Sequence, residues 1–271
     1  MPAEHSFDRY RMPDALWENL WKLLPVYKVI PSGGTPRRNF RSIADAIFYR
    51  LRTGCQWKAI PRSLPPGSTA HDYFKEWVRL GVFGQLWQLA LAHYDELVGL
   101  DWRWQSVDAA MTKSPLGGEM TGKNPTDRGK QGTKRSIIAD AVGIPLCLVI
   151  SGANTHDIHL LEGTLEDGLK RSPRSQSQTT PSRKEHLCLD KGYDSLRVRE
   201  MVSRMYGYVP HVRSRGEERK QKHRRKARRW VVERTHGWLN RFRGLIIRWD
   251  KKSANHLACA YITLKQYAVF G

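Results

Sequence analysis

The chain has 271 residues, of which 40% are hydrophobic and 10 are tryptophan, so it is long enough to bury a substantial core and to form two domains. Lys and Arg total 46 against 26 Asp and Glu, and the resulting net charge of +20 favours a polyanionic partner. There is no run of about 18 apolar residues and no signal-like segment at the N-terminus, so we expect a soluble cytoplasmic protein without a membrane span.

The first 98 residues predict an all-α domain. Apolar side chains recur at helical spacing in four segments, 13–24, 40–53, 68–83 and 84–98. We expect Gly54 to end the second helix and Ser68 or Thr69 to cap the third. Short helices joined by tight turns are typical of a helix-turn-helix module, although any three-helix bundle fits the same pattern.

After residue 99 the pattern changes to one of strands and helices. A strand is expected at 102–114, and 134–152 predicts two strands joined by a Val-Gly-Ile-Pro turn. The later elements are expected as a helix at 157–170, a strand at 186–190, a helix at 194–205, a strand at 207–212 and a helix at 224–243. This order predicts a mixed α/β domain over 99–271, with a flexible Ser/Pro/Thr-rich loop at 171–185.

The four cysteines are scattered through the chain, and none belongs to a C-x-x-C pair. They are Cys55, Cys147, Cys188 and Cys259. Each has apolar or small neighbours, so we expect reduced thiols in the core rather than disulfides or zinc ligands.

Three acidic residues stand out from this arrangement. Asp108 lies in the second half of a predicted strand, Asp190 directly follows the apolar strand residues LCL, and Glu233 lies in the last predicted helix. If the two strands are neighbours, the two aspartates meet at one edge of the sheet. Magnesium prefers oxygen ligands and needs few protein carboxylates. Two such ions about 3.5–4 Å apart can cut or join phosphodiesters, which is the chemistry that these acids predict.

Glu233 is set in the most basic part of the chain. Residues 211–250 contain 14 Lys or Arg and 4 Asp or Glu, and an apolar period runs through them, so we predict a structured basic helix. Residues three, four and seven apart share a helix face. The polar residues expected to hold phosphates beside Glu233 are Lys226, Arg229, His236, Asn240 and Arg241. The alternative is a surface ion pair between Glu233 and Arg229 or Arg241.

Each aspartate also has a structural interpretation. Either Asp108 or Asp190 could be a turn residue at the end of a strand. Other acids compete for the site: Asp140 is expected in the middle of the hairpin, Asp194 as a helix N-cap and Glu200 on a helix surface. The His residues of HDIH at 156–159 do not share one helical face, so no zinc site is expected there.

Four segments together resemble bacterial insertion-sequence transposases of the DDE type. They are GKNPTDRGKQGTKRSIIADAVGIPL at 122–146, GANTHD at 152–157, LDKGYDS at 189–195 and VVERTHGWLNRFRGL at 231–245. The likeness is greatest to the insertion-sequence-five family, within the insertion-sequence-four-like superfamily. TGCQWKAIP at 53–61 and STAHDYFKEWVRLGVF at 68–83 resemble the helical domain that precedes the catalytic domain in these proteins. The resemblance covers about 12–270.

The resemblance implies an RNase H-like catalytic domain with a mixed five-stranded sheet flanked by helices. It assigns the catalytic and metal-binding positions to Asp108 and Asp190, on the first and fourth strands, and to Glu233, on a later helix. It further implies two Mg²⁺ ions, with Mn²⁺ as a substitute. The family's Tyr, Arg, Glu, Lys signature is only partly present, because Lys226 replaces the Tyr and Asn240 the Lys. No long insertion precedes the glutamate helix, so 213–229 and a partner subunit are expected to grip DNA.

The implied activity is that of a transposase. It would bind the terminal inverted repeats of an insertion sequence, cleave the transposon ends and transfer the strands into target DNA. Residues 37–83 would recognise the ends, and the candidate phosphate contacts there are Arg37, Arg38, Arg41, Lys75 and Arg79. A homodimer associated with the bacterial nucleoid is expected, since two ends must be joined. The alternatives are an inactive or domesticated DNA-binding relative and an RNase H-like nuclease or junction resolvase.

Overall fold

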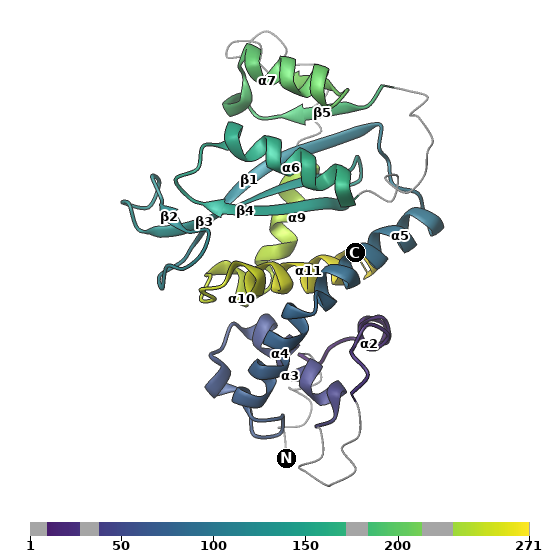
Figure 1. Cartoon of the computed structure of the whole chain (residues 1–271), viewed down its shortest axis with the longest axis vertical. Helices are drawn as coiled ribbons and strands as arrows, with labels where there is room; N and C mark the ends of the chain where they lie inside the picture. The colour runs from purple at the N-terminus through teal and green to yellow at the C-terminus, as the bar shows by residue number, and fades with distance from the viewer. Residues whose placement is uncertain (1–9, 28–37, 172–183, 213–229, 271) are drawn as a thin grey trace.

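The computed structural model describes residues 10–27, 38–171, 184–212 and 230–270. A group of helices near the N-terminus lies at one end of the molecule, and an α/β region lies at the other (Figure 1). Two helices that are far apart in the sequence, α5 (Val82–Leu97) and α11 (Ser253–Phe270), run between these two parts. The predicted order of an all-α region followed by an α/β region is confirmed.

The N-terminal part consists of α2 (Asp14–Trp21), α3 (Phe40–Thr53), a short 3-10 turn η1 (Trp57–Ala59) and α4 (Gly67–Arg79). Helix α3 begins after Asn39, whose side chain accepts hydrogen bonds from two backbone amides, and it ends at Gly54 with a φ of 71°. The expected cap of α4 is wrong, because the N-cap is Pro66 and not Ser68 or Thr69.

The predicted single helix over 68–83 is divided by a glycine. Gly81 has a φ of 72°, a left-handed conformation that an α-helix cannot contain, so α4 ends at Arg79 and α5 starts at Val82. The change of direction lets α5 leave the N-terminal helices and pack against α11.

The sheet contains β1 (Trp104–Lys113), β2 (Gly122–Lys123), β3 (Gln131–Ala139), β4 (Pro145–Gly152), β5 (His186–Leu189) and β6 (Val209–Val212). Its five longer strands lie in the order β4, β3, β1, β5, β6. The first three are antiparallel, whereas β1, β5 and β6 are parallel. This confirms the RNase H-like mixed sheet, to which the two-residue strand β2 adds a sixth member beside the start of β3.

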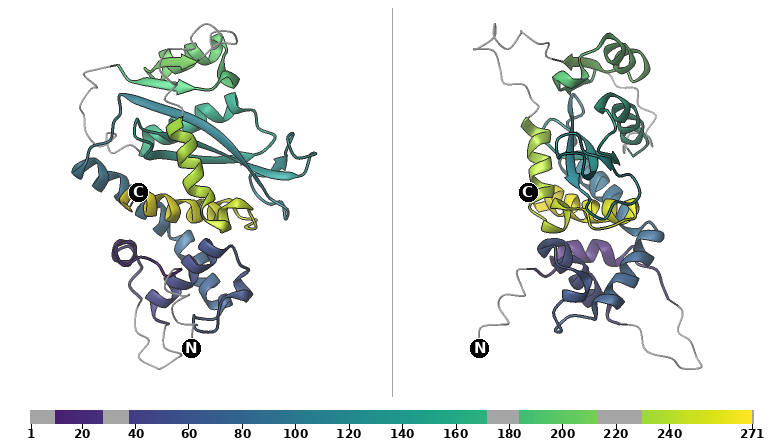
Figure 2. Two further views of the ribbon diagram at one scale, coloured as in Figure 1. Left: turned by 180° about the vertical axis from the view of Figure 1, so that it is seen from behind. Right: turned by 90° about the vertical axis from the view of Figure 1, so that its left-hand side faces the viewer.

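Helices cover both faces of the sheet. Helix α6 (Asp157–Arg171) packs on β3 and β4, and α9 (Trp230–Asn240) packs on β1 and β3 from the opposite side (Figure 2). The predicted helix over 194–205 consists of α7 (Leu196–Glu200) and a π-helical turn η4 (Met201–Met205). Its N-cap is Ser195 and not the expected Asp194, because the Ser195 hydroxyl accepts the amide of Val198.

The C-terminal region differs most from expectation. The described part of the last predicted helix ends at Asn240 rather than at residue 243, and the predicted residues 224–229 lie outside the described part of the chain. Two unpredicted helices follow, α10 (Arg243–Ile246) and α11. Helix α11 contacts α5, α9 and β4, so apolar residues surround most of its length and no single helical stripe shows in the sequence.

One hydrophobic core joins the two parts of the molecule. It extends from Leu16 in α2 through Trp87 in α5 to Leu264 in α11. In the described part of the chain none of the four cysteines forms a disulfide, and three are buried while Cys55 is half-buried. None of the described helices is long and apolar enough to cross a membrane. The domain boundary at 98/99 stays a prediction.

Candidate active site

Strand pairing brings Asp108 and Asp190 close together in the backbone. β1 and β5 are parallel neighbours with Ser106 opposite Cys188, so the same register continued by two residues puts Asp190 level with Asp108. The backbone at Asp190 is still extended, with φ −73° and ψ 165°. Neighbouring strands lie about 4.8 Å apart, and residues paired in register point to the same face. The two aspartates therefore belong to one face of adjacent strands.

That face is the one that α9 covers. Asp108 is paired with Ile137 in β3, and Ile137 lies two residues after Arg135, on the same face of that strand. The guanidinium Nη2 of Arg135 donates a hydrogen bond to Asn240 in α9 at 3.1 Å. The intervening residues of β3 face α6 instead, since Ser136 accepts a hydrogen bond from Thr164 of that helix. Both aspartates consequently share their side of the sheet with the glutamate helix.

His236 ties α9 to the Asp108 strand. Its Nε2 lies 3.4 Å from the backbone carbonyl oxygen of Asp108, an acceptor, so the contact requires the ring proton on Nε2. Glu233 is exposed and lies three residues before His236, which puts both on one side of the helix. Thus Glu233 lies about one helical turn from the histidine that contacts the backbone of Asp108.

The expectation that His236 lies on an exposed cationic face is wrong. The side chain is 6% exposed, and burial, together with the nearby Arg135 guanidinium, lowers its pKa to about 4. A neutral ring beneath the helix cannot hold a phosphate as a cation. Arg135 is likewise buried, and burial lowers its pKa to about 10. The exposed Asn240 accepts from this guanidinium, so its amide oxygen already has a structural partner.

Asp190 is a turn residue at the end of its strand, which is the structural interpretation given above as the alternative to a catalytic role. Its Oδ1 accepts the backbone amide of Lys191 at 2.6 Å and thereby caps the 3-10 turn η3 (Lys191–Tyr193). A carboxylate has two oxygens and about four acceptor positions, so this bond leaves capacity for further ligands. The cap also fixes the rotation of the side chain at the strand end.

The competing acids are engaged in local structure. Asp140 is fully buried after β3 and accepts the amides of Val142 and Ile144, so it closes the β3–β4 turn, and burial raises its pKa. Asp194 pairs with Arg199 at 2.8 Å, and Glu200 pairs with Arg204 at 3.5 Å on the surface. Each of these three acids is therefore held in a local structural role.

A divalent cation suits the chemical type of the three candidate ligands, since all are carboxylates. In the described residues, however, no group of three or more His, Cys, Asp or Glu side chains is gathered closely enough to hold a metal ion. The backbone arrangement and the donor type therefore fit magnesium. The side chains of Asp108, Asp190 and Glu233 must move toward one another before all three can bind the same ion. Glu233, exposed on α9, has the longest reach of the three.

The N-terminal phosphate candidates fall into two groups. Arg41 is not available to DNA, because it pairs with Asp14 at 2.7 Å and Asp45 at 3.2 Å and its side chain is only 16% exposed. Arg38, Lys75 and Arg79 are exposed. Arg241, in the C-terminal set, is exposed with its guanidinium 5.8 Å from the Tyr267 ring centre. The predicted residues outside the described part are Arg37, Lys226 and Arg229, together with the rest of 213–229.

Comparison with known proteins gives matches along most of the chain. Residues 12–87 match the family described as "Putative transposase of IS4/5 family", and residues 103–264 match the one described as "Transposase DDE domain". The chain is 36% identical over 144 residues to the "Putative transposase for insertion sequence element IS402" of Burkholderia cepacia, which covers 50% of this chain and 62% of that protein. The match thus spans less than two thirds of this relative.

Two further similarities are more distant. A 16.2 kDa uncharacterised protein of the IS402 element, also from Burkholderia cepacia, is 28% identical over 117 residues, or 41% of this chain and 79% of its own. A chain in the crystal structure of a pre-cleavage Mos1 transpososome aligns with a TM-score of 0.30 and 10% identity over 89% of this chain and 81% of its own. This last likeness is too weak to define the fold.

Proposed function

Because the chain belongs to the family of transposases with a DDE domain, we propose that it is a DNA transposase that moves an insertion sequence. It binds the terminal inverted repeats and cleaves the transposon ends to free their 3′-hydroxyls. Each 3′-hydroxyl then attacks a phosphodiester of target DNA, so that the transposon strand is joined to the target phosphate and the target's own 3′-oxygen leaves. The observation that carries this proposal is the parallel register of β1 and β5, which makes Asp108 and Asp190 neighbours on the face that α9 covers.

The protein's part in this chemistry is to hold carboxylates and DNA in fixed positions. We assign Asp108, Asp190 and Glu233 as the residues that hold two Mg²⁺ ions, with Mn²⁺ as a substitute. Bound divalent ions supply an activated water and neutralise the leaving oxygen. Asp108 is held by a central strand, and Asp190 by its cap on η3. Glu233 is held through α9, which the contact between His236 and the Asp108 carbonyl joins to the sheet.

The surrounding cations supply the DNA contacts in this proposal. Exposed basic residues are available at Arg38 just before α3, at Lys75 and Arg79 in α4, and at Arg241 beyond α9. Such residues position the phosphate backbone without reading its sequence. Lys226 and Arg229, beyond the described part of the chain, remain candidates for the same role. We expect a homodimer on double-stranded DNA, since two transposon ends must be brought together.

The test is cleavage of DNA that carries the genomic sequence flanking this reading frame, in the presence of Mg²⁺. We expect end-specific nicks from the wild type and their loss in Glu233→Gln. Glu200→Gln is the matched control, because Glu200 is an exposed helical glutamate on α7 whose partner is a surface arginine. Nicking that survives in Glu233→Gln would remove Glu233 from the active site.

A second readout separates the transposase from its alternatives. Cleaved ends should join to a target plasmid, and an RNase H-like nuclease or junction resolvase would cut without joining them. DNA binding by the wild type without any cutting, under Mg²⁺ or Mn²⁺, would instead identify an inactive DNA-binding relative.

A further inference from the structure

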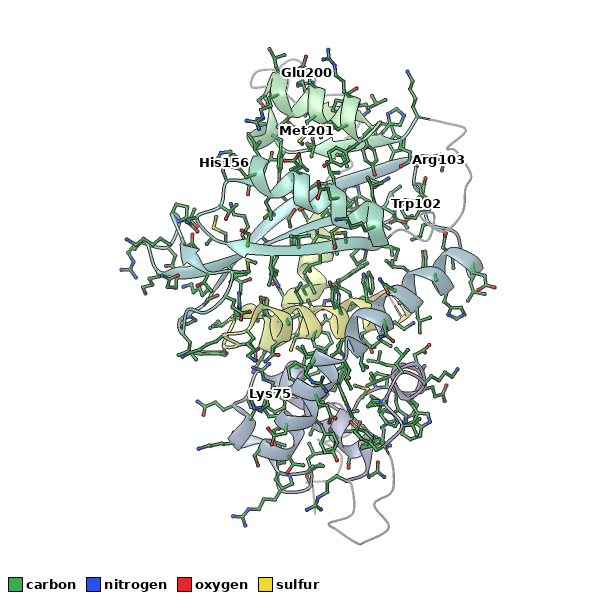
Figure 3. The ribbon with its side chains drawn as sticks, in the orientation of Figure 1. Lys75, Trp102, Arg103, His156, Glu200 and Met201 are labelled. Carbon is green, nitrogen blue, oxygen red and sulfur yellow. The ribbon has the colours of Figure 1, made fainter. Side chains whose placement is uncertain are left out.

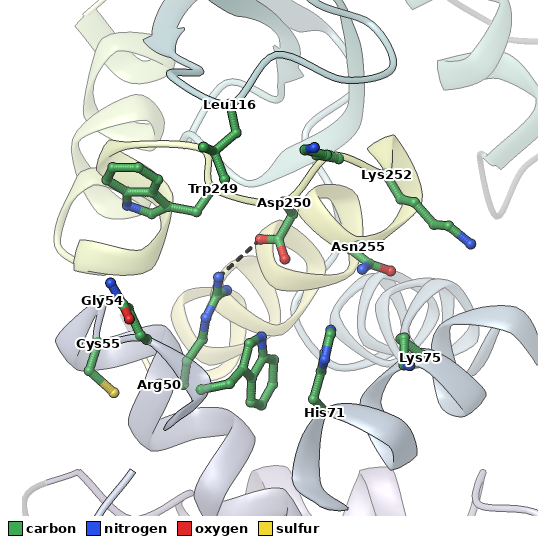
Figure 4. Close-up of a pocket in the computed structure, with 13 residues that line it drawn as sticks. Arg50, Gly54, Cys55, His71, Lys75, Leu116, Trp249, Asp250, Lys252 and Asn255 are labelled. Carbon is green, nitrogen blue, oxygen red and sulfur yellow. Dashed lines mark hydrogen bonds and ion pairs between the residues drawn. The ribbon is translucent and has the colours of Figure 1, made fainter. Parts of the chain in front are cut away.

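A cavity of about 760 Å³ lies where the N-terminal helices meet the segment that leads into α11. This volume is within the range of about 300–1,000 Å³ that is usual for small-molecule sites. The N-terminal side contributes residues from α3, η1 and α4, and the other side contributes 249–252, Asn255 and Leu116 (Figure 4). The cavity lies apart from the face with Asp108, and the proposed catalysis does not use it.

The base of this cavity is a buried ion pair. Arg50 of α3 donates Nη2 to Asp250 at 3.2 Å, and both side chains are about 6% exposed. The guanidinium carbon also lies 5.2 Å from the centre of the Trp57 ring. Within the described residues the Nε of Arg50 has no hydrogen-bond partner, although its side chain lines the cavity. The Nε atom itself is shielded from solvent, so it adds no exposed donor to the cavity surface.

The remaining charges in the cavity wall are positive. Lys251 and Lys252 line it and are exposed, as is Lys75, whose ammonium pairs with Asp72 at 2.8 Å. Asp250, its one acidic lining residue in the described structure, is paired with Arg50. The wall therefore favours an anion. Lys75 comes from α4 and Lys252 from the segment before α11, so the lysines lie on both sides of the junction (Figures 3 and 4). Lys251 belongs to the same segment as Lys252.

Large apolar side chains are exposed at the same place. Trp249 is 45% and Leu116 is 54% exposed, and Trp57 is stacked on His71 with ring centres 4.8 Å apart. An aromatic ring next to cations is the combination that binds nucleic acid strands, because a base can stack while the phosphate meets a positive charge. A purely apolar ligand would leave the lysines unused, and an inorganic anion would leave Trp249 unused.

The loop that presents Trp249 is held rigidly. Arg248 donates Nε to the carbonyl of Asp250 at 2.8 Å and Nη2 to the carbonyl of Lys251 at 3.1 Å. The amide of Glu119 donates to the same Lys251 carbonyl at 2.8 Å. At Gly118 a Cβ atom would lie 2.4 Å from that oxygen, so the two backbones are in close contact. The backbone that carries the tryptophan and the two lysines is consequently fixed in place, which lowers the cost of ordering this loop on binding.

We propose that this junction cavity, formed by Arg50, Trp57, Lys75, Trp249, Lys251 and Lys252, binds one unpaired nucleotide of a DNA strand. The base stacks on Trp249, and the phosphate lies among the lysines. The source of the nucleotide rests on the proposed function, under which DNA is present at this junction. The cavity's own chemistry, an aromatic ring beside cations, is independent of catalysis.

The first experiment uses the full-length protein and a short single-stranded oligothymidylate with one 5-bromodeoxyuridine, photo-crosslinked and mapped by mass spectrometry. We expect the cross-link on the peptide that contains Trp249. Loss of one stacked base should weaken binding in Trp249→Ala by roughly 5- to 150-fold, with partial recovery in Trp249→Phe. Trp21→Ala is the matched control, because Trp21 is 55% exposed on α2 and does not line the cavity. Cross-links that map elsewhere would overturn the proposal.

The second experiment tests the phosphate and the source of the nucleotide. Lys251→Gln combined with Lys252→Gln should reduce the dependence of oligothymidylate affinity on salt, since each phosphate contact on a single strand contributes a slope of about 0.7. Lys22→Gln, at the exposed C-cap of α2, should leave that slope unchanged. Free thymidine monophosphate that competes as well as the oligonucleotide would overturn the assignment to a DNA strand.

Failure of this proposal and failure of the proposed function give different results. If the wild type nicks transposon ends but Trp249→Ala binds oligothymidylate normally, the nucleotide cavity is wrong and the transposase stands. If cross-links map to Trp249 while end cleavage persists in Glu233→Gln, the cavity stands and the catalytic assignment fails.

Discussion

The ion pair between Arg50 and Asp250 joins α3 to a segment that follows it by 200 residues in the chain. Both residues are buried, with only 5% and 8% of their surfaces exposed, so neither charge is solvated in the folded protein. Asp250→Asn keeps the size of the side chain and removes the charge. Breaking a buried pair by removing one partner costs about 3–5 kcal/mol, because the other charge stays buried without compensation.

The measurement is thermal unfolding followed by circular dichroism. For chains of 150–250 residues, 1 kcal/mol corresponds to about 2–4 °C in Tm, so Asp250→Asn should lower the Tm by roughly 6–20 °C. Asp72→Asn is the control, because its ion pair with Lys75 is exposed and its loss should leave the Tm almost unchanged.

The double variant Arg50→Met with Asp250→Ala tests whether the loss of stability comes from leaving one charge buried without its partner. It removes both charges, so it should be less destabilised than the sum of its two single variants. A Tm decrease of less than about 3 °C in Asp250→Asn would refute the reasoning, since it would mean that Arg50 is compensated without its carboxylate.

Three further predictions concern pH, glycine and metal. The pKa of His236 is about 4 in the folded protein and about 6.5 in the unfolded chain, so the unfolded state binds more protons between these two pH values. About 3 kcal/mol of stability should therefore be lost as the pH falls from 6.5 to 4. Urea unfolding at a series of pH values should show a smaller dependence of stability on pH in His236→Phe. Gly67→Ala should lower the free energy of unfolding in urea by more than about 1 kcal/mol, because the new Cβ would lie 1.7 Å from the carbonyl oxygen of Trp57. The Cβ of Gly163→Ala in α6 would meet nothing within 4 Å, so this control should raise the free energy of unfolding by about 0.5–1 kcal/mol. Asp190→Asn should abolish end cleavage without loss of the fold, as an amide oxygen can still cap η3, and unchanged nicking would exclude Asp190 as a metal ligand.

Much of the fold could be predicted because its signals are local. The helical spacing in α3 and the apolar run of β5 are properties of short segments, and the observed elements agree with them closely. The resemblance to transposases selected Asp108, Asp190 and Glu233 from among several acids. Burial of Asp140 could not be read from the same patterns, because it depends on amides that the β3–β4 turn brings to the carboxylate.

By itself the sequence determined the types of most elements, the basic charge and the family likeness, since each depends on residues close together in the chain. Only the tertiary structure decided which faces are buried. His236 and Arg41 are polar residues on predicted helices, yet packing against β1 and pairing with Asp14 and Asp45 remove them from the surface. The cavity at the junction likewise joins α3 to residues about 200 positions later, and no local pattern encodes contacts at that separation.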